Sequence, residues 1–162
     1  ALVDQAVEIA SNDFDLTESF DFKSLTIQRE FAADLPAVPA TANELEQVLL
    51  NLLKNAAQAI HQRDDNSTPG QIILRVRLAP PWAEIQVEDN GVGMPESVRK
   101  RIFEPFFTTK EVGQGTGLGL SVSYFIITNN HKGQMEVQSK AGQGTCFTLR
   151  LPMTTATPDT GL

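Results

Sequence analysis

Hydrophobic residues recur at helical spacing in three parts of the chain. In residues 2–10 they lie three and four positions apart, as in a short amphipathic helix. A longer pattern predicts a helix over 43–61, and Thr41 and Glu44 at its start have the Ser/Thr-x-x-Glu spacing of a capping box. A third pattern predicts a buried helix over 118–130. The side chains expected to face inward on this last helix are Leu118, Val122, Phe125 and Ile126.

Five further stretches have the composition of β-strands, and four of them form two pairs. A turn at Pro80 and Pro81 separates the first pair and a glycine-containing turn the second, so each pair predicts a hairpin. The expected strands cover 24–31, 71–78, 82–88, 134–139 and 145–151. The order of elements predicts an α+β fold: a two-layer α/β sandwich, with about three helices on one face of a mixed, mostly antiparallel sheet of about five strands.

A glycine-punctuated segment follows the first hairpin and reaches Gly117. Pro95 has the fixed dihedral angle and the missing amide that suit a first helical position, so we expect a brief helix over 95–103. The whole segment is too long for a plain connection between elements. We therefore predict that it forms a functional lid.

Length and composition agree with one compact domain. The chain has 162 residues, of which 41% are hydrophobic, and single domains commonly contain about 100 to 200 residues. We expect this domain over 1–152 and a disordered tail over 153–162, where the residues are small and polar. The net charge of −7 disfavours nucleic acid and anionic membranes as partners, because both attract clustered Lys and Arg.

Cys146 is the only cysteine in the chain. An internal disulfide is therefore impossible, and we expect a reducing compartment, the cytoplasm. The sequence has no run of about 18 apolar residues and no secretory signal, so we expect no membrane contact by this segment. Because the first residue is Ala1 rather than Met, we expect a fragment of a longer protein, with any membrane anchor upstream.

Four amide side chains follow one edge of the helix predicted over 43–61. Gln47, Asn51, Asn55 and Gln58 are spaced by four, four and three residues, which brings them onto one side. A solvent-facing polar margin would explain the two glutamines equally well. Two asparagines one turn apart need another reason, because asparagine competes with the helix backbone for hydrogen bonds. Their amide oxygens would suit magnesium together with phosphate oxygens and water.

Glycines gather at the start of the helix predicted over 118–130. The stretch from Gly113 to Ser121 reads GQGTGLGLS, and bare backbone beside a helix start can close on a negatively charged group. The lysine of a P-loop is missing, and no strand leads directly into the stretch as in a dinucleotide-binding fold. A phosphate cradle and a plain flexible loop are the two interpretations that remain.

Asp89 ends the strand-like stretch EIQVED on the same side as Ile85 and Val87. A carboxylate that faces the interior must meet hydrogen-bond donors, such as backbone amides, water or the exocyclic amine of a bound purine. Gly91 and Gly93 follow at once and would let a flat ring approach the backbone. An ordinary Asp-Asn-Gly turn after a strand is the competing interpretation.

Four motifs resemble, in the right order, the N, G1, F and G2 boxes of the catalytic ATP-binding domain of sensor histidine kinases. They read NELEQVLLNLLKNAAQAI, VEDNGVGMP, IFEPFFTTK and GQGTGLGLSVSYFI. The resemblance covers nearly the whole chain and is closest to the nitrogen-regulatory and oxygen-sensing kinases, whose helix commonly reads Asn-Ala-x-Gln-Ala. It implies the Bergerat ATP-binding fold, with ATP and Mg²⁺ as ligands.

The resemblance also implies roles for the matching residues. Asn55 would contact Mg²⁺, Asn51 would lie near the phosphates, and Asp89 would receive the adenine amine. Lys110, on the lid, would reach a phosphate, although an exposed lysine is almost as good an explanation; with the two asparagines it completes the predicted catalytic set. The other residues expected to contact the nucleotide are Gln58, Gly91, Gly93, Met94, Gly115, Thr116, Gly117, Leu118, Gly119, Leu120 and Thr145.

The residue at position 58 and the phenylalanines of the F box qualify this picture. Many relatives have Lys where this chain has Gln58, which removes one possible phosphate cation. In the F box, Phe103, Phe106 and Phe107 would pack the lid and its contacts, and a plain core role explains at least one of them equally well.

In gyrases, mismatch-repair ATPases and the heat-shock chaperone of this fold, a glutamate that activates water stands one turn before the metal-binding asparagine. Here that position is Asn51, and an amide cannot act as a general base at neutral pH. The resemblance therefore implies transfer of the γ-phosphate rather than hydrolysis. The alternatives are a nucleotide-binding regulatory module without phosphotransfer and a hydrolytic or serine-kinase relative.

The resemblance implies a histidine as phosphoacceptor, but neither histidine of the chain has the family's acceptor context. We therefore assign His61 and His131 to structure and expect the acceptor on an upstream dimerisation domain of the same parent protein, with a response regulator as an indirect partner. His131 resembles the first residue of the family's His-Gly-Gly turn, in which Lys132 replaces a glycine.

Overall fold

The computed structural model describes residues 2–17, 24–33, 35–64, 67–107 and 119–153. The helices are α1 (Leu2–Thr17), α2 (Ala42–His61), α3 (Glu96–Arg99) and α4 (Gly119–Phe125), and α4 continues as a π-helical turn, η2 (Ile126–Asn130). The strands are β1 (Thr26–Phe31), β2 (Gln71–Ala79), β3 (Trp82–Asp89), β4 (Gln134–Lys140) and β5 (Gly144–Pro152).

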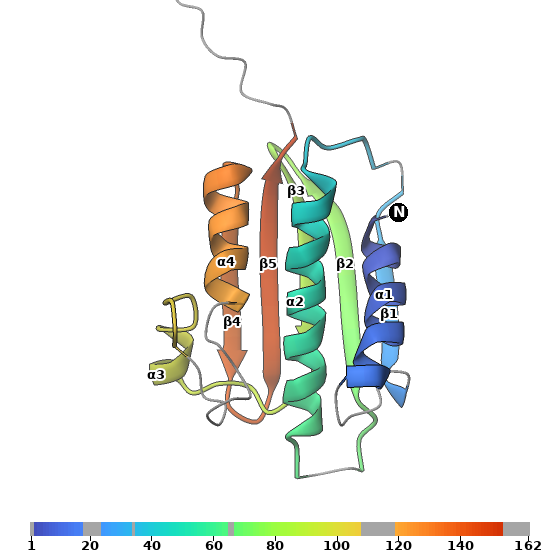
Figure 1. Ribbon diagram of the computed structural model, residues 1–162, viewed down its shortest axis with the longest axis vertical. Helices are drawn as coiled ribbons and strands as arrows, with labels where there is room; N and C mark the ends of the chain where they lie inside the picture. The colour runs from blue at the N-terminus through green and yellow to red at the C-terminus, as the bar shows by residue number, and fades with distance from the viewer. Residues whose placement is uncertain (1, 18–23, 34, 65–66, 108–118, 154–162) are drawn as a thin grey trace, which may run out of the picture.

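The five strands form one sheet in the order β1-β2-β3-β5-β4. Strand β1 runs parallel to β2, and every other neighbouring pair is antiparallel. Helices α1, α2 and α4 lie side by side on one face of this sheet (Figure 1). The predicted fold class, a two-layer α/β sandwich with a mixed, mostly antiparallel sheet, is confirmed, as are both hairpins.

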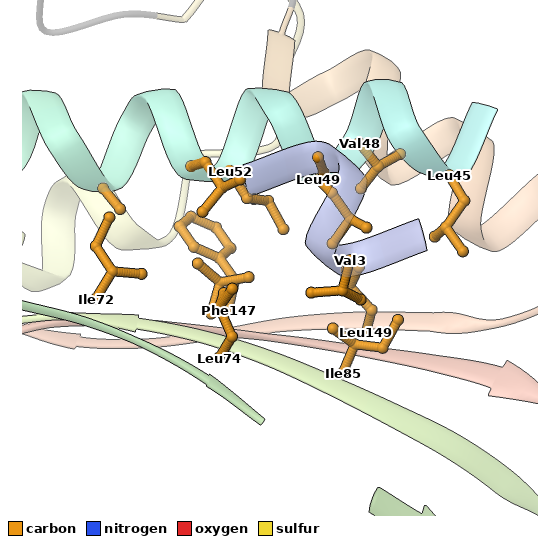
Figure 2. Packing of buried hydrophobic residues seen from close by; sticks show 14 of the residues in the cluster. Val3, Leu45, Val48, Leu49, Leu52, Ile72, Leu74, Ile85, Phe147 and Leu149 are labelled. Atoms are coloured by element: carbon orange, nitrogen blue, oxygen red, sulfur yellow. The ribbon is translucent and has the colours of Figure 1, made fainter. Parts of the chain in front are cut away.

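The core fills the space between α2 and the sheet (Figure 2). Apolar residues three and four positions apart on α2 place Leu45, Leu49 and Leu52 above sheet residues such as Leu74 and Leu149. Full burial of one such side chain stabilises the fold by about 1.5 to 3 kcal/mol. This packing fixes the rotation of α2 and therefore the direction in which its amide-bearing edge faces.

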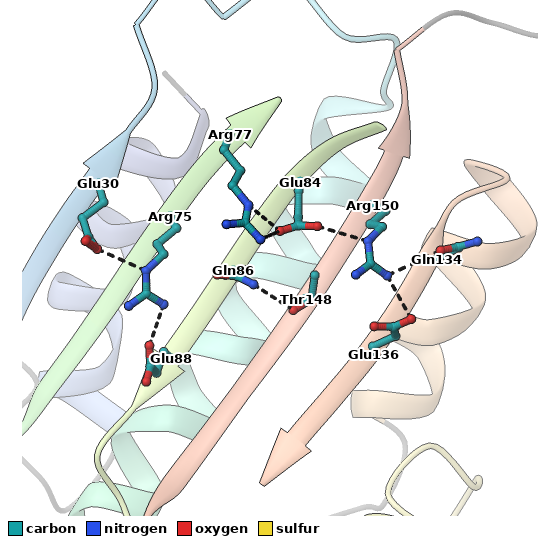
Figure 3. Close-up of polar contacts among 10 residues, drawn as sticks. All are labelled: Glu30, Arg75, Arg77, Glu84, Gln86, Glu88, Gln134, Glu136, Thr148 and Arg150. Carbon is teal, nitrogen blue, oxygen red and sulfur yellow. Dashed lines mark hydrogen bonds and ion pairs between the residues drawn. The ribbon is translucent and has the colours of Figure 1, made fainter. Parts of the chain in front are cut away.

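The other face of the sheet is polar, because successive residues of a strand point to opposite sides. Figure 3 shows arginines and acids paired across the strands. Arg75 on β2 bonds to Glu30 and Glu88, and Glu84 on β3 accepts bonds from Arg77 and Arg150. The helices cover one face only, as the sandwich prediction requires.

The predicted capping box is wrong. Thr41 is the N-cap residue of α2, but its side chain makes no capping hydrogen bond. Its backbone N–H donates instead to Nε2 of His131, and Glu44 accepts a bond from Asn130. Residues at the end of η2 thus bond to two of the groups that the capping box was expected to pair with each other, the N–H of Thr41 and the carboxylate of Glu44.

The inward stripe predicted for the helix over 118–130 is also wrong in part. Val122 is 40% exposed and Phe125 is 55% exposed, whereas Ile126 is buried as expected. The buried side consists of Ser123, Ile126 and Ile127. Because one residue of that buried side is a hydrogen-bonded serine, a prediction from hydrophobicity alone selects the wrong face of α4. Leu118 lies outside the described residues.

Two further boundaries differ from the predictions. Helix α1 extends to Thr17 rather than ending near residue 10, and α3 is only four residues long, with Pro95 as its N-cap rather than its first residue. None of the helices in the described ranges has both the length and the apolar composition needed to span a membrane.

Candidate functional site

Asp89 is the last residue of β3 and lies between Ile72 of β2 and Thr145 of β5. It is only 5% exposed, so the predicted inward direction of its carboxylate is confirmed. Its Oδ1 accepts a hydrogen bond of 2.8 Å from the backbone N–H of Gly91. The sheet thus carries one acid on its helix-covered side at the end of the central strand.

Burial raises the pKa of Asp89 to about 6, because the charged form loses its hydration. Backbone hydrogen bonds from Gly91 and Thr145 work in the opposite direction, and the charge of Glu88 raises the pKa slightly further. The carboxylate is therefore largely ionised at neutral pH but poorly solvated. A ligand that brings a hydrogen-bond donor to this oxygen pair would relieve that cost.

Three glycines hold the loop after β3 close to its neighbours. A Cβ on Gly91 would lie 2.6 Å from the backbone of Ala59 on α2, and one on Gly93 would lie 2.1 Å from the carbonyl oxygen of Lys140. Gly93 also has a φ of 68° and Gly144 a φ of 90°, angles that favour glycine. The predicted pocket glycines therefore shape the loop through contacts with protein backbone.

Backbone hydrogen bonds complete this arrangement. The N–H of Val92 donates to the carbonyl oxygen of Ala59, and the N–H of Gly142 donates to that of Val92. The loop is thereby fixed between the end of α2 and the β4–β5 turn, which meet at the lower end of the sheet in Figure 1. Asn90 bonds to Gln71 and Pro69 and so anchors the loop to the start of β2.

Ser139 is a site residue that the sequence reasoning missed. Its Oγ accepts a bond of 2.8 Å from the N–H of Met94 and lies 2.8 Å from Oγ1 of Thr145. Two of the predicted nucleotide contacts, Met94 and Thr145, are therefore joined by one hydroxyl next to Asp89. The available signal was the register of the last hairpin, which pairs Ser139 with Thr145.

The amide edge of α2 runs past this loop. Gln47 is exposed, whereas Asn51, Asn55 and Gln58 are half-buried. Among the described residues, Oε1 of Gln58 is buried without a hydrogen-bond partner, and Nδ2 of Asn51 donates to Oγ of Ser123 on α4. The solvent-margin interpretation therefore fits Gln47, while the other three amides are partly covered by the rest of the protein.

The described part of the chain has no group of three His, Cys, Asp or Glu side chains that could hold a metal ion. The donor set on α2 consists of neutral amide oxygens, and one of them is an orphaned buried acceptor. Mg²⁺ accepts such ligands when phosphate oxygens and water complete its octahedron. The residues present thus fit a metal that arrives together with a phosphorylated ligand.

Part of the predicted site lies outside the described residues. This applies to Lys110, Gly115, Thr116, Gly117 and Leu118. The described structure resumes at Gly119, the first residue of α4, where a Cβ would lie 2.4 Å from Oδ1 of Asn51. Leu120 packs against the core from the same helix.

The family model of the histidine kinase-, DNA gyrase B- and HSP90-like ATPases matches residues 40–155 of the chain. The chain belongs to this ATPase family. The match includes the amide edge of α2, Asp89, the glycine loop and the start of α4.

Relatives of this ATPase domain include sensor kinases. It is 44% identical to the two-component sensor PprA of Pseudomonas aeruginosa over 122 residues, which are 72% of this chain and 12% of PprA. It is also 44% identical to the signal transduction histidine-protein kinase AtoS of Escherichia coli over 125 residues, 76% of this chain and 19% of AtoS. The ATPase domain thus spans less than a fifth of either relative.

Solved structures share the fold of the domain. The catalytic domain of histidine kinase ThkA superposes with a TM-score of 0.75 and 26% identity, covering 94% of this chain and 92% of that one. Full-length ShkA in complex with AMPPNP also gives a TM-score of 0.75, with 27% identity over 97% of this chain and 30% of ShkA.

Proposed function

We propose that this ATPase domain binds Mg-ATP and donates the γ-phosphate to a histidine on a separate dimerisation and phosphoacceptor domain of the same parent protein. The transfer belongs to two-component signalling, in which a response regulator receives the phosphoryl group afterwards. The catalytic unit covers residues 1–152, and its activity takes place in the cytoplasm. The observation that carries the proposal is the buried, poorly solvated carboxylate of Asp89, whose hydrogen-bond partner Gly91 packs against Ala59 of α2, the residue next to Gln58.

Five predicted site residues that the structure describes have the following roles in this proposal. Asp89 accepts a hydrogen bond from the adenine amine, Thr145 and Met94 flank the base, and Asn55 provides an oxygen for Mg²⁺. Gln58 offers its orphaned Oε1 to a donor of the bound nucleotide or its hydrated metal. Bound Mg²⁺ would neutralise charge on the phosphates.

The choice of transfer over hydrolysis rests on Asn51. Its amide cannot remove a proton from water, and its nitrogen is already bonded to Ser123. Asn51 therefore cannot activate water to attack the γ-phosphate, which is left for an external acceptor.

Nucleotide binding is tested by calorimetry on the whole chain with ATP, in Mg²⁺ and in EDTA. Asp89→Asn should weaken ATP binding about ten- to hundredfold, the cost of losing a buried charged hydrogen bond. Glu88→Gln is the matched control, because the adjacent acid points to the opposite face and bonds to Arg75. Equal affinities for wild type and Asp89→Asn would remove Asp89 from the site.

Phosphotransfer is tested with γ-labelled ATP and the separately produced upstream region of the parent protein. Acid-labile label should appear on that region only when the ATPase domain and Mg²⁺ are both present. The domain alone should remain unlabelled. Rapid phosphate release by the domain alone would favour a hydrolytic ATPase, and ATP binding without any labelling would favour a regulatory module.

A further inference from the structure

Ser123 is a buried hydroxyl that joins two helices. It lies on α4, and only 2% of the residue is exposed. Its Oγ donates a hydrogen bond of 2.9 Å to the carbonyl oxygen of Gly119 in its own helix. The same atom accepts a bond of 3.2 Å from Nδ2 of Asn51 on α2.

These bonds decide which way the Asn51 amide is turned. Because Ser123 has a single hydroxyl proton and gives it to Gly119, it can only accept from Asn51, so the amide nitrogen must face it. The amide oxygen is then turned toward Gly119, where a Cβ would lie only 2.4 Å away. Glycine at 119 leaves room for this orientation, and any larger residue would collide with the oxygen.

The orientation has chemical consequences at the site. Gly119 is the first residue of α4, so the Asn51 oxygen lies at the start of the helix, the end at which the glycine-rich stretch meets it in the sequence. An oxygen there can accept a bond from a metal-bound water or contact the cation itself, but it repels a phosphate oxygen. A flipped amide would present N–H groups and reverse both preferences.

We propose that Ser123 is a positioning residue, which holds the Asn51 amide so that its oxygen supports Mg²⁺ in the nucleotide site. This inference rests on the proposed function. Serines often bond to the carbonyl four residues earlier in their own helix, and that bond alone would be unremarkable. The bond to Asn51 is different because it joins two elements that are 72 residues apart in the sequence.

The chain offers a matched control in Thr128. Its hydroxyl donates to the carbonyl oxygen of Tyr124, also four residues earlier, at 2.7 Å. Within the described ranges this hydroxyl makes no hydrogen bond to another element. Thr128→Ala thus removes the same local bond without touching Asn51.

The first measurement uses the nucleotide-free chain. NMR should show the side-chain amide protons of Asn51 shifted and slow to exchange in the wild type and in Thr128→Ala. In Ser123→Ala the side-chain amide protons of Asn51 should exchange faster and lose their altered chemical shift, because the hydroxyl oxygen that accepted their hydrogen bond is gone.

The second measurement compares ATP affinity in Mg²⁺ with ATP affinity in EDTA. Ser123→Ala should reduce the gain from Mg²⁺ by about fivefold, the equivalent of one neutral hydrogen bond, and leave the EDTA affinity within about twofold. Thr128→Ala should change neither value. Asn51→Ala should lose the same gain, and adding Ser123→Ala to it should cause no further loss.

Equal weakening in Mg²⁺ and EDTA, or additive losses in the double variant, would overturn the positioning role. If Ser123→Ala fails to fold, Ser123→Cys replaces it, since sulfur is a much poorer acceptor, and the same outcomes decide. Failure of the wild-type chain to bind ATP at all would instead contradict the proposed function.

Discussion

The imidazole of His131 connects the end of η2 to the start of α2. Its Nε2 accepts a hydrogen bond of 2.9 Å from the backbone N–H of Thr41, and its Nδ1 lies 2.9 Å from the carbonyl oxygen of Ile126. Both contacts are satisfied together only by the neutral ring with its proton on Nδ1. A histidine 90 residues away thus takes the place of the Glu44 side chain, which in a capping box would accept the bond from the N–H of Thr41.

Because of this contact, we expect His131→Ala to lower the stability of the domain more than Thr41→Ala, the reverse of what a capping box would predict. His131→Ala should lower the free energy of unfolding by about 1 to 2 kcal/mol, because it removes the acceptor of the Thr41 N–H and one of the two hydrogen bonds to the oxygen of Ile126, which keeps its bond from the backbone N–H of residue 131. Thr41→Ala should cost less than about 0.5 kcal/mol, since the hydroxyl makes no capping bond. Urea denaturation of both variants checks this, and a larger loss for Thr41→Ala would contradict the structure.

Asp89→Asn should stabilise the nucleotide-free domain at neutral pH. The folded-state pKa of about 6 lies above the reference value of 3.8, so the folded chain binds the extra proton and loses stability as pH rises between these values. At pH 7 the ionised, buried carboxylate of Asp89 therefore lowers the free energy of unfolding by roughly 3 kcal/mol.

Denaturation of wild type and Asp89→Asn from pH 4 to pH 7 measures this effect. The difference between them should grow from near zero at the acid end to its full size at neutral pH. Glu88→Gln, which removes the neighbouring acid from the polar face, should show no such gain. A constant difference across the range would mean that the carboxylate carries no burial cost.

Lys132→Gly should raise stability by about 0.5 to 1 kcal/mol. Lys132 has a φ of 55°, in the left-handed region that strains residues with a Cβ, and its side chain is exposed. Lys100→Gly is the control, because the exposed Lys100 has a φ of −62° and should only lose stability. Thermal unfolding of the two variants should therefore shift in opposite directions.

Glu84→Gln should destabilise the domain by about 1.5 to 3 kcal/mol, the range for hydrogen bonds to charged groups. The Glu84 side chain is only 4% exposed and bonds to both Arg77 and Arg150 on the polar face (Figure 3). Glu136→Gln breaks a bond of an exposed acid to the same Arg150 and should cost at most about 1 kcal/mol. Equal losses in chemical denaturation would show that burial of Glu84 adds nothing.

The elements and their layers were predictable from the sequence because each depends on local periodicity. The three- and four-residue spacing on α2 and the alternation in the four hairpin strands are local properties, and burial follows from them. The same alternation predicted that Asp89 faces inward, which is confirmed. The contacts assigned to the nucleotide, including those of Asn55 and Gln58, stay predictions.

The tertiary structure alone decided which polar groups meet. Ser123 bonds to Asn51 and His131 to Thr41 across long stretches of sequence, and each pairing depends on how one packed helix is rotated and shifted against another. Local spacing carries no information about that rotation, so it selected the wrong face of α4 and a capping box that does not form. Side-chain hydrogen bonds act over about 3 Å, and only the packed chain fixes distances between elements that closely.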